Sequence, residues 1–182
     1  MFGNLDVLLL SLDDFDKKIN VEENCKSIRE NSIKKAVETA KISGKLSLAD
    51  DSGLEVDALN GVPGVYSARF AGEGCTYKDN NKKLLNLMKD IPLKKRSAKF
   101  VCVFALADRK GFIKTATGIC MGKITLKEIG KNGFGYDPIF IPNGYKKTFA
   151  QMNLDEKNKI SHRSKASSKM KIFLKKFINK NA

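Results

Sequence analysis

The sequence predicts an α/β protein, with a mixed β-sheet flanked by helices, that forms a single domain over residues 1–182. Short apolar runs typical of strands alternate along the chain with segments whose apolar residues recur at helical spacing. The middle of the chain is antiparallel in character, while its two flanks alternate helix and strand. A hydrophobic content of 42% and a charged content of 30% suit one globular domain with a substantial core.

The first expected elements are a strand over residues 5–12 and a helix behind Ser27. The strand is apolar enough to lie centrally in a sheet. Ser27 and Glu30 have the spacing of a capping box, and the helix then carries apolar residues at period 3.6. Gly44 is a good C-terminal stop for this helix.

The next stretch is expected to form a strand, an acidic turn and a second strand. Leu46, Leu48 and Ala49 form a short apolar run, residues 50–53 have the sequence Asp-Asp-Ser-Gly, and residues 54–57 alternate apolar and acidic side chains. Adjacent carboxylates repel each other, and a hard cation that binds both of them offsets this repulsion. Asp-Ser-Gly is also an ordinary composition for a solvated turn, so this stretch alone leaves both interpretations open.

The strongest strand is expected at residues 98–107, whose apolar run indicates burial on both faces. Residues 108–111 predict a hairpin turn, followed by a partner strand at 112–121 and another at 122–129.

Two further helices are expected on either side of this region. Thr76 and Asp79 resemble an N-cap pair, and the helix behind them ends near Pro92. Ser161 is a plausible N-cap of the last helix.

Composition narrows the classes of function. The net charge of +14 would suit either a nucleic acid or a small polyanion. Lysines far outnumber arginines and are scattered, which favours a solvated surface and no nucleic-acid partner, with a basic nucleic-acid binder as the alternative. No apolar run approaches the ~20 residues that cross a bilayer, so no membrane partner is expected. The four cysteines are widely spaced, without a Cys-x-x-Cys pair, and indicate reduced thiols in a cytoplasmic protein.

Residues 133–138 (Gly-Phe-Gly-Tyr-Asp-Pro) form a candidate ligand-binding loop. The glycines let backbone approach a ligand, and Phe134 and Tyr136 offer flat faces for stacking. Asp137, fixed by the following proline, can accept hydrogen bonds from a base or sugar. Glycine-aromatic turns are common in sheets, so the loop alone is weak support for a site.

The start of the last helix places His162 and Arg163 in its first turn, with Lys157 nearby in the sequence. Positive charge is unfavourable at a helix N-terminus, which indicates an anion or an electron-rich ligand. A lone histidine at a helix start is more often structural or exposed than catalytic, and that alternative stays open.

Three segments, in this order, resemble the inosine triphosphatase-like family of non-canonical purine nucleoside triphosphate pyrophosphatases. They are residues 49–54 with 61–70, residues 133–140 and residues 156–163. Each motif is modest, but the ordered set is specific, and the resemblance covers essentially the whole chain. It implies an elongated, two-lobed fold with a central cleft, usually as a homodimer. It also implies Mg²⁺-dependent hydrolysis of ITP, dITP and XTP to the monophosphate and pyrophosphate, which removes deaminated purines from the nucleotide pool.

The resemblance also assigns roles to individual residues. Asp51 resembles the general base and a metal-binding carboxylate, and Glu23 the second metal ligand, with Glu22 as its alternative. Arg163 and protonated His162 would donate hydrogen bonds to a 6-keto oxygen and clash with the 6-amino group of adenine, which is itself a donor. The expected substrate contacts are Ser52, Phe134, Gly135, Tyr136, Asp137, Lys157, His162 and Arg163.

One departure concerns the start of the chain. Members of the family open with a strand, a Thr/Ser-x-x-Asn-x-x-Lys loop and a helix that hold the triphosphate. After Asn4 the lysine of that loop is absent, with Val7 in its place, and residues 5–15 match the family's second strand instead. The alternative to an active enzyme is therefore an N-terminally truncated, weakly active or inactive nucleotide-binding member of the same fold.

Overall fold

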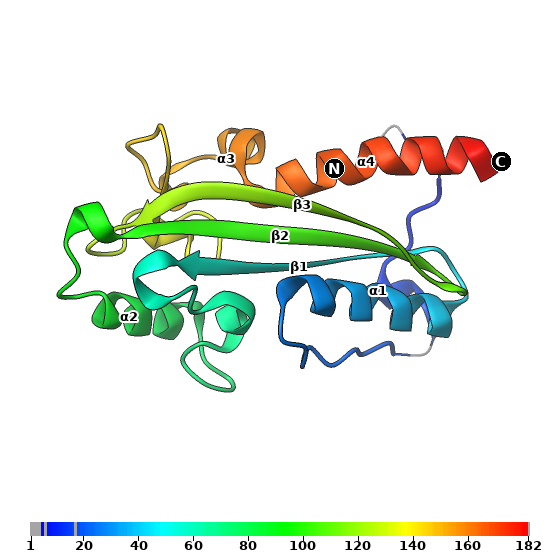
Figure 1. Ribbon diagram of the computed structural model, residues 1–182, viewed down its shortest axis with the longest axis horizontal. Coiled ribbons are helices and arrows are strands. Elements are labelled where there is room, and N and C mark those ends of the chain that lie inside the picture. The colour runs from blue at the N-terminus through cyan, green and yellow to red at the C-terminus, as the bar shows by residue number, and fades with distance from the viewer. Residues whose placement is uncertain (1–4, 6, 17, 182) are drawn as a thin grey trace. The chain divides into compact units, whose positions relative to one another are not determined.

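The structure, a computed structural model, describes residues 5, 7–16 and 18–181. Its four strands form one sheet in the order β1-β2-β3-β4, accompanied by helices (Figure 1). This arrangement confirms the predicted α/β class. The strands are β1 (Ser47–Val56), β2 (Ser97–Asp108), β3 (Gly111–Ile124) and β4 (Phe140–Pro142). The helices are α1 (Ile28–Ser43), α2 (Tyr77–Leu87), α3 (Leu154–Ile160) and α4 (His162–Asn181).

The chain forms two compact units, which are described separately below. Strands β1, β2 and β3 each continue from one unit into the other. The first unit comprises Met1–Asp51, Cys102–Gly118 and Lys165–Ala182, and the second comprises Ser52–Val101 and Ile119–Ser164.

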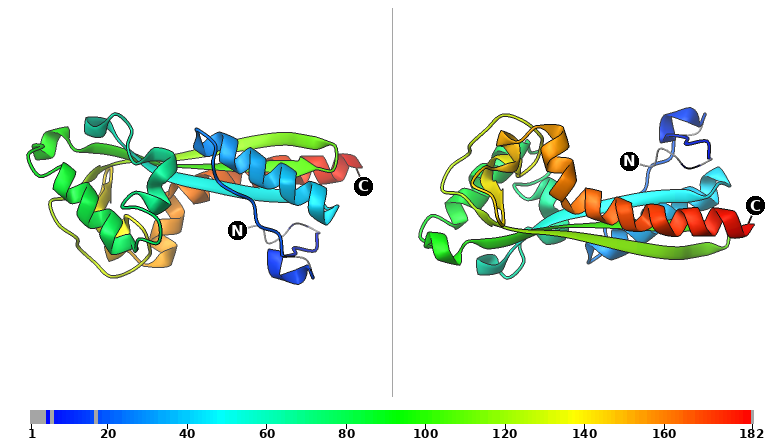
Figure 2. Two further views of the ribbon diagram at one scale, coloured as in Figure 1. Left: turned by 90° about the horizontal axis from the view of Figure 1, so that it is seen from below. Right: turned by 90° about the horizontal axis from the view of Figure 1, so that it is seen from above.

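In the first unit, α1 and α4 pack on opposite faces of the strands, and α4 runs along them (Figures 1 and 2). Helix α1 packs through Ala36 and Ala40 onto Ala105 and Ala107 of β2. Because side chains alternate along a strand, the other face of β2 meets α4 through larger residues. These are Cys102, Phe104 and Leu106 of β2 with Ala166, Met170 and Leu174 of α4.

The predicted helix starts of α1 and α2 are confirmed by their caps. Ser27 Oγ accepts the backbone N–H of Glu30 at 3.1 Å, and Gly44 ends α1 in the left-handed conformation at φ 71°. Thr76 and Asp79 cap α2 reciprocally, with Asp79 N–H donating to Thr76 Oγ1 at 3.2 Å and Thr76 N–H donating to Asp79 Oδ2 at 2.9 Å.

The N-cap predicted at Ser161 is also confirmed, because Ser161 Oγ accepts the Ser164 N–H at 3.2 Å. The short helix α3 before it was not predicted. Its signal was present, since Asn153 and Glu156 have capping-box spacing and cap each other's backbone at 2.9 Å. Across the described residues, no helix is both long and apolar enough to cross a membrane.

The predicted turn at residues 50–53 is wrong, because β1 runs through it without interruption. Gly53 does not adopt a positive φ, so the backbone stays extended there. Successive side chains of a strand point to opposite faces, which separates Asp50 from Asp51. Asp50 Oδ2 lies 3.7 Å from Cys102 Sγ, on the α4 side, whereas Asp51 faces α1. Each carboxylate therefore has its own surroundings, and the mutual repulsion that suggested a turn is relieved.

The hairpin predicted between β2 and β3 is confirmed, but the separate strand predicted at residues 122–129 is wrong. Strand β3 continues to Ile124 and pairs antiparallel with β4, with Gly122 opposite Pro142. A Cβ atom at Gly122 would lie 2.4 Å from the carbonyl oxygen of Ile141, so the close approach of β4 requires a glycine.

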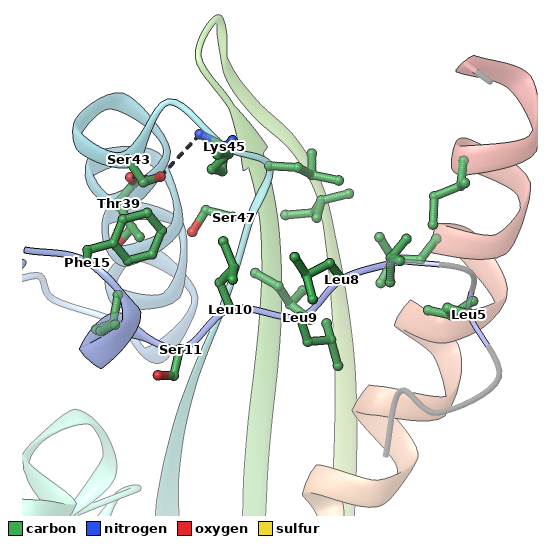
Figure 3. Close-up of a pocket in the computed structure, with 17 residues that line it drawn as sticks. Leu5, Leu8, Leu9, Leu10, Ser11, Phe15, Thr39, Ser43, Lys45 and Ser47 are labelled. Carbon is green, nitrogen blue, oxygen red and sulfur yellow. Dashed lines mark hydrogen bonds between the residues drawn. The ribbon is translucent and has the colours of Figure 1, made fainter.

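The strand predicted at residues 5–12 is wrong as well. Residues 7–11 form no strand, and Asp6 lies outside the described residues. No ladder joins this segment to the described sheet, and a strand without a neighbour leaves its backbone groups unpaired. Leu8 and Leu9 are 85% and 64% exposed and line a cavity of 630 Å³ with residues of α1, β1 and α4 (Figure 3).

In the second unit, an aromatic cluster forms the core behind the candidate ligand-binding loop. The ring of Phe140 lies 4.7 Å from that of Phe100 and 5.2 Å from that of Phe149, centre to centre. Leu54 and Leu84 complete the same cluster without solvent exposure. Burial of these large side chains fixes the elements that carry the candidate site residues of this unit.

Candidate functional site

In the first unit, a lysine joins the two carboxylates that the sequence analysis assigned to a metal. Lys35 Nζ, on α1, lies 2.8 Å from Glu23 Oε1 and 3.1 Å from Asp51 Oδ1. Asp51, within β1, ends the first of the three segments that make up this unit, and Glu23 precedes α1. Lys35 was not among the site residues predicted from the sequence. The available signal was its position directly before Ala36, on the flank of the apolar stripe, where a lysine can bury its stem and present its charge.

This environment changes the proton affinity of both groups. Asp51 is only 9% exposed, and burial raises the pKa of its carboxyl above the ordinary value, although the charge and hydrogen bond of Lys35 oppose the shift. Burial also disfavours the charged form of Lys35. The hydrogen bond to Glu23 and the charges of Asp51 and Glu23 outweigh that effect and raise the pKa of Lys35. The result is a protonated lysine beside a carboxylate with increased proton affinity.

Glu22, the alternative to Glu23, lies elsewhere. Its side chain is exposed, and its Oε2 accepts from Asn24 Nδ2 at 2.9 Å. Glu23, in contrast, shares the ammonium group of Lys35 with Asp51. Of the two adjacent acids, Glu23 is therefore the one that the structure places with Asp51.

The donor set of this group fits a divalent cation. Among the described residues, no cluster of three or more His, Cys, Asp or Glu side chains could enclose a metal by itself. Mg²⁺ is nevertheless commonly bound by one or two carboxylates together with substrate phosphates. The ammonium group of Lys35 already lies between the oxygens of Glu23 and Asp51, so this pair is arranged around a positive charge.

In the second unit, five candidate side chains form a continuous chain of contacts from Ser52 to Asp137. Arg163 Nη2 donates to Ser52 Oγ at 3.3 Å, and its guanidinium carbon lies 5.8 Å from the centre of the Phe134 ring. Lys157 Nζ lies 4.7 Å from the same ring centre. The Phe134 ring is 52% exposed, so a flat aromatic surface lies beside two cations and remains open to a ligand.

Asp137 fixes the loop from within, because its side chain is almost fully buried. Its Oδ2 accepts the backbone N–H of Phe134 at 2.9 Å and forms an ion pair with Lys157 Nζ. A Cβ atom at Gly133 would lie 2.0 Å from this oxygen, and Gly133 adopts φ 77°, so both space and conformation require glycine. Gly135 also has a positive φ, of 60°. Asp137 thus sets the position of Lys157 and of the loop.

Two expected substrate contacts lie deeper than the sequence analysis assumed. Tyr136 is buried in the core, and its hydroxyl donates to the Ser67 carbonyl at 2.9 Å, so its ring is not an open stacking surface. His162 is 5% exposed and stacks on Phe100, with ring centres 4.6 Å apart and planes 9° from parallel. The stacking fixes the orientation of the His162 ring, and His162 is the residue directly before Arg163.

These features define an α/β protein with two carboxylates around a cation in one unit and an aromatic surface beside two cations in the other. The chain belongs to the Ham1 family, whose sequence model matches residues 1–173.

Similar proteins are found in several bacteria. A protein from Desulforamulus reducens named dITP/XTP pyrophosphatase is 50% identical over 161 residues, which cover 88% of this chain and 80% of that protein. A protein of the same name from Elusimicrobium minutum is 50% identical over 168 residues, which cover 92% and 85%. The Ham1 protein structure from Staphylococcus aureus is 43% identical and superposes with a TM-score of 0.81, covering 90% of this chain and 82% of that one.

Proposed function

We propose that this chain hydrolyses the non-canonical purine nucleoside triphosphates ITP, dITP and XTP to the monophosphate and pyrophosphate, and so removes deaminated purines from the nucleotide pool. Two relatives that are 50% identical over most of the chain carry the name dITP/XTP pyrophosphatase. The observation that carries the proposal is the arrangement of Glu23, Lys35 and Asp51, which suits the chemistry of a phosphoanhydride.

Asp51 is the proposed general base. In the reaction, the oxygen of a water molecule bonds to the α-phosphorus while the bond to the β-phosphate oxygen breaks. Asp51 would accept a proton from this water. Burial raises the pKa of its carboxyl in the direction of neutral pH, which makes the carboxylate a better general base. Lys35, which stays protonated beside it, is a suitable donor to a phosphate oxygen.

Glu23 and Asp51 are the proposed ligands of Mg²⁺, which would neutralise the charge that develops on the leaving pyrophosphate. The support is the nature of the two side chains and the positive charge already held between them. Without the metal, Lys35 supplies that charge and limits the repulsion between the carboxylates.

The residues of the second unit are the proposed base-recognition group. Phe134 offers its half-exposed ring for stacking, and Lys157 and Arg163 offer donors for the 6-keto oxygen of hypoxanthine or xanthine. Adenine presents a 6-amino group instead, which would leave such donors unpaired. His162 is assigned to the same group, and Ser52, Gly135, Tyr136 and Asp137 are assigned to positioning the ligand and these side chains.

Three further points complete the proposal: a single domain, a homodimer and a cytoplasmic location. The domain and the homodimer rest on the resemblance described above. For the location, no disulfide joins any of the four cysteines in the structure, which suits a reducing compartment.

Product analysis with Mg²⁺ tests the proposed function. Chromatography of reactions with dITP and XTP is expected to give the monophosphate and pyrophosphate in equal amounts, with little turnover of dATP. Asp51→Asn is the control for contamination by other phosphatases. Release of orthophosphate, or binding of inosine monophosphate without any turnover of dITP, would rule out the proposed reaction, and the second result would favour an inactive nucleotide-binding member.

A further inference from the structure

Asn31 is a buried residue of α1 that the roles above do not use. It is 1% exposed and lies one helical turn before Lys35, so both side chains project from the same face of the helix. Asn31 Oδ1 accepts the backbone N–H of Cys25 at 3.0 Å. Cys25 is two residues after Glu23, so this hydrogen bond anchors the segment that carries Glu23 to α1.

The other end of the Asn31 side chain has a donor to spare. Among the described residues, the buried Nδ2 atom has no hydrogen-bond partner. An unpaired buried donor is unfavourable, so its persistence calls for an acceptor nearby. Lys35, one turn further along the same face of α1, reaches Asp51 Oδ1 at 3.1 Å, so the amide of Asn31 lies on the side of the helix that faces this carboxylate.

We propose that Asn31 is a positioning residue for the reaction: its Oδ1 holds the segment that carries Glu23, and its Nδ2 orients the carboxylate of Asp51. This inference rests on the proposed function, because it gives Asn31 a part at the same two carboxylates. Lys35 makes a parallel connection between Glu23 and Asp51, but through a charge.

The neutral amide of Asn31 can hold Glu23 and Asp51 in a situation where the charged ammonium group of Lys35 cannot. The ammonium group of Lys35 is attracted by a substrate phosphate and competes with any divalent cation for the same two carboxylates. The amide of Asn31 carries no net charge, so it neither follows the phosphate nor repels the cation. Asn31 therefore keeps Glu23 and Asp51 in place when the ammonium group leaves its position between them.

Titration of the nucleotide-free protein with Mn²⁺, followed by calorimetry, tests this role without any turnover. Asn31→Ala is expected to weaken Mn²⁺ binding about 10–100-fold, the usual effect of removing a group that orients metal ligands. Ser32→Ala is the matched control, because Ser32 is the next residue of α1, is fully buried and donates only within the helix, to the Arg29 carbonyl. Circular dichroism shows whether both variants stay folded.

Asn31→Asp separates the two ends of the side chain. The aspartate keeps an acceptor for the Cys25 N–H but replaces the amide donor by a carboxylate facing Asp51. If Nδ2 orients Asp51, this variant loses at least as much kcat for dITP as Asn31→Ala, while KM changes little in both. A kcat equal to that of the wild type would overturn the role of Nδ2, because then only the anchoring of the segment matters.

The two measurements distinguish failure of this inference from failure of the proposed function. If the wild-type chain does not hydrolyse dITP, the proposed reaction is wrong, and the Mn²⁺ titration still decides the role of Asn31. If the wild type hydrolyses dITP and Asn31→Ala matches it in Mn²⁺ affinity and kcat, Asn31 alone is wrongly assigned. Absence of Mn²⁺ binding by the wild type would also overturn the inference.

Discussion

The carboxylate of Asp51 occupies a position that suits proton transfer better than it suits stability. Asp51 belongs to β1 and its side chain is mostly buried. Burial disfavours its charged form, and the charge and hydrogen bond of Lys35 compensate for this effect only in part. A carboxylate in such a setting holds a proton more readily than one in water. Functional groups are often kept in environments of this kind, where activity and stability make opposite demands.

Asp51→Asn is expected to abolish pyrophosphate release from dITP and to leave the melting temperature unchanged or raised. Because the folded-state pKa of Asp51 is raised, the carboxyl contributes its stability at low pH and loses it as the pH rises through that value. At neutral pH, a neutral side chain of the same shape therefore removes an unfavourable charge. Scanning calorimetry and steady-state kinetics check both parts, and either a clear fall in melting temperature or normal turnover would contradict the assignment.

The raised pKa of Lys35 predicts how the stability of the fold changes at alkaline pH. Its pKa is raised above the ordinary 10.5, so its contribution to stability is complete below that pH and is lost as the pH rises through the folded-state value. Lys35→Met is expected to lower the free energy of unfolding at neutral pH by about 1–3 kcal/mol, because it leaves two carboxylates without their cation.

Urea unfolding of the wild type and Lys35→Met across a pH series measures this contribution. The difference between the two proteins should stay constant up to about pH 10 and shrink above it. Lys34→Met is the matched control, since Lys34 is the adjacent lysine and its ion pair with Glu38, at 3.9 Å, is partly exposed and worth little. A difference that does not change with pH would show that Lys35 acts through packing alone.

At the scale of elements, the conformation of the loop around Phe134 depends on a glycine at position 133. Gly133→Ala would place a Cβ atom 2.0 Å from Asp137 Oδ2 and would disturb the ion pair of Asp137 with Lys157. We expect the KM for dITP to rise about tenfold or more, in addition to the ~1–2 kcal/mol of strain from the left-handed backbone.

Gly144→Ala separates the strain from the contact. Gly144 adopts φ 84° and has no atom within 4 Å of the position that a Cβ would take, so this variant carries strain without a steric conflict. It should lose a similar amount of stability and keep the KM of the wild type. Equal KM values for Gly133→Ala and Gly144→Ala would mean that Asp137 does not position the loop for binding.

The exposed leucines of residues 7–11 are a second feature at this scale. Since Leu8 and Leu9 are largely exposed, replacing both by Ser should change the free energy of unfolding by no more than about 0.5 kcal/mol. Binding of the dye ANS and self-association should fall, because an apolar patch is removed. Leu54→Ala, at a fully buried position, should cost about 2–5 kcal/mol in comparison. A large loss of stability in the Leu8 and Leu9 variant would show that these side chains are packed.

The helices were more predictable than the strands for a physical reason. Helix caps are local, so Ser27, Gly44 and Thr76 could be assigned from a few neighbouring residues, and the structure confirms them. Strand ends depend on partners that are distant in the sequence. Asp50 and Asp51 resembled a turn because the separate surroundings that each finds on the two faces of β1 could not be read from their order.

The same limit applies to the candidate site. The motif residues Glu23 and Asp51 could be named from the resemblance, but Lys35 is separated from them by 12 and 16 residues and belongs to no motif in the sequence analysis. Tyr136 is the opposite case, since the sequence placed it correctly in the loop but not in the core. Which loop residues face a ligand depends on packing, and local sequence does not determine it.

At the scale of the whole molecule, the family was identifiable because several modest motifs occur in a fixed order. The family match over residues 1–173 confirms that identification. In the proposal, the first unit supplies the phosphate chemistry through Glu23, Lys35 and Asp51. The second supplies base recognition through Phe134 and the cations beside it.

The ratio of kcat/KM for dITP to that for dATP, measured by pyrophosphate release with Mg²⁺, tests the central claim most directly. Donors aimed at a 6-keto oxygen remain unpaired with adenine, so the account predicts a ratio on the order of 10⁴ in favour of dITP. Comparable values for the two nucleotides would contradict it, because the side chains around Phe134 would then not read the purine.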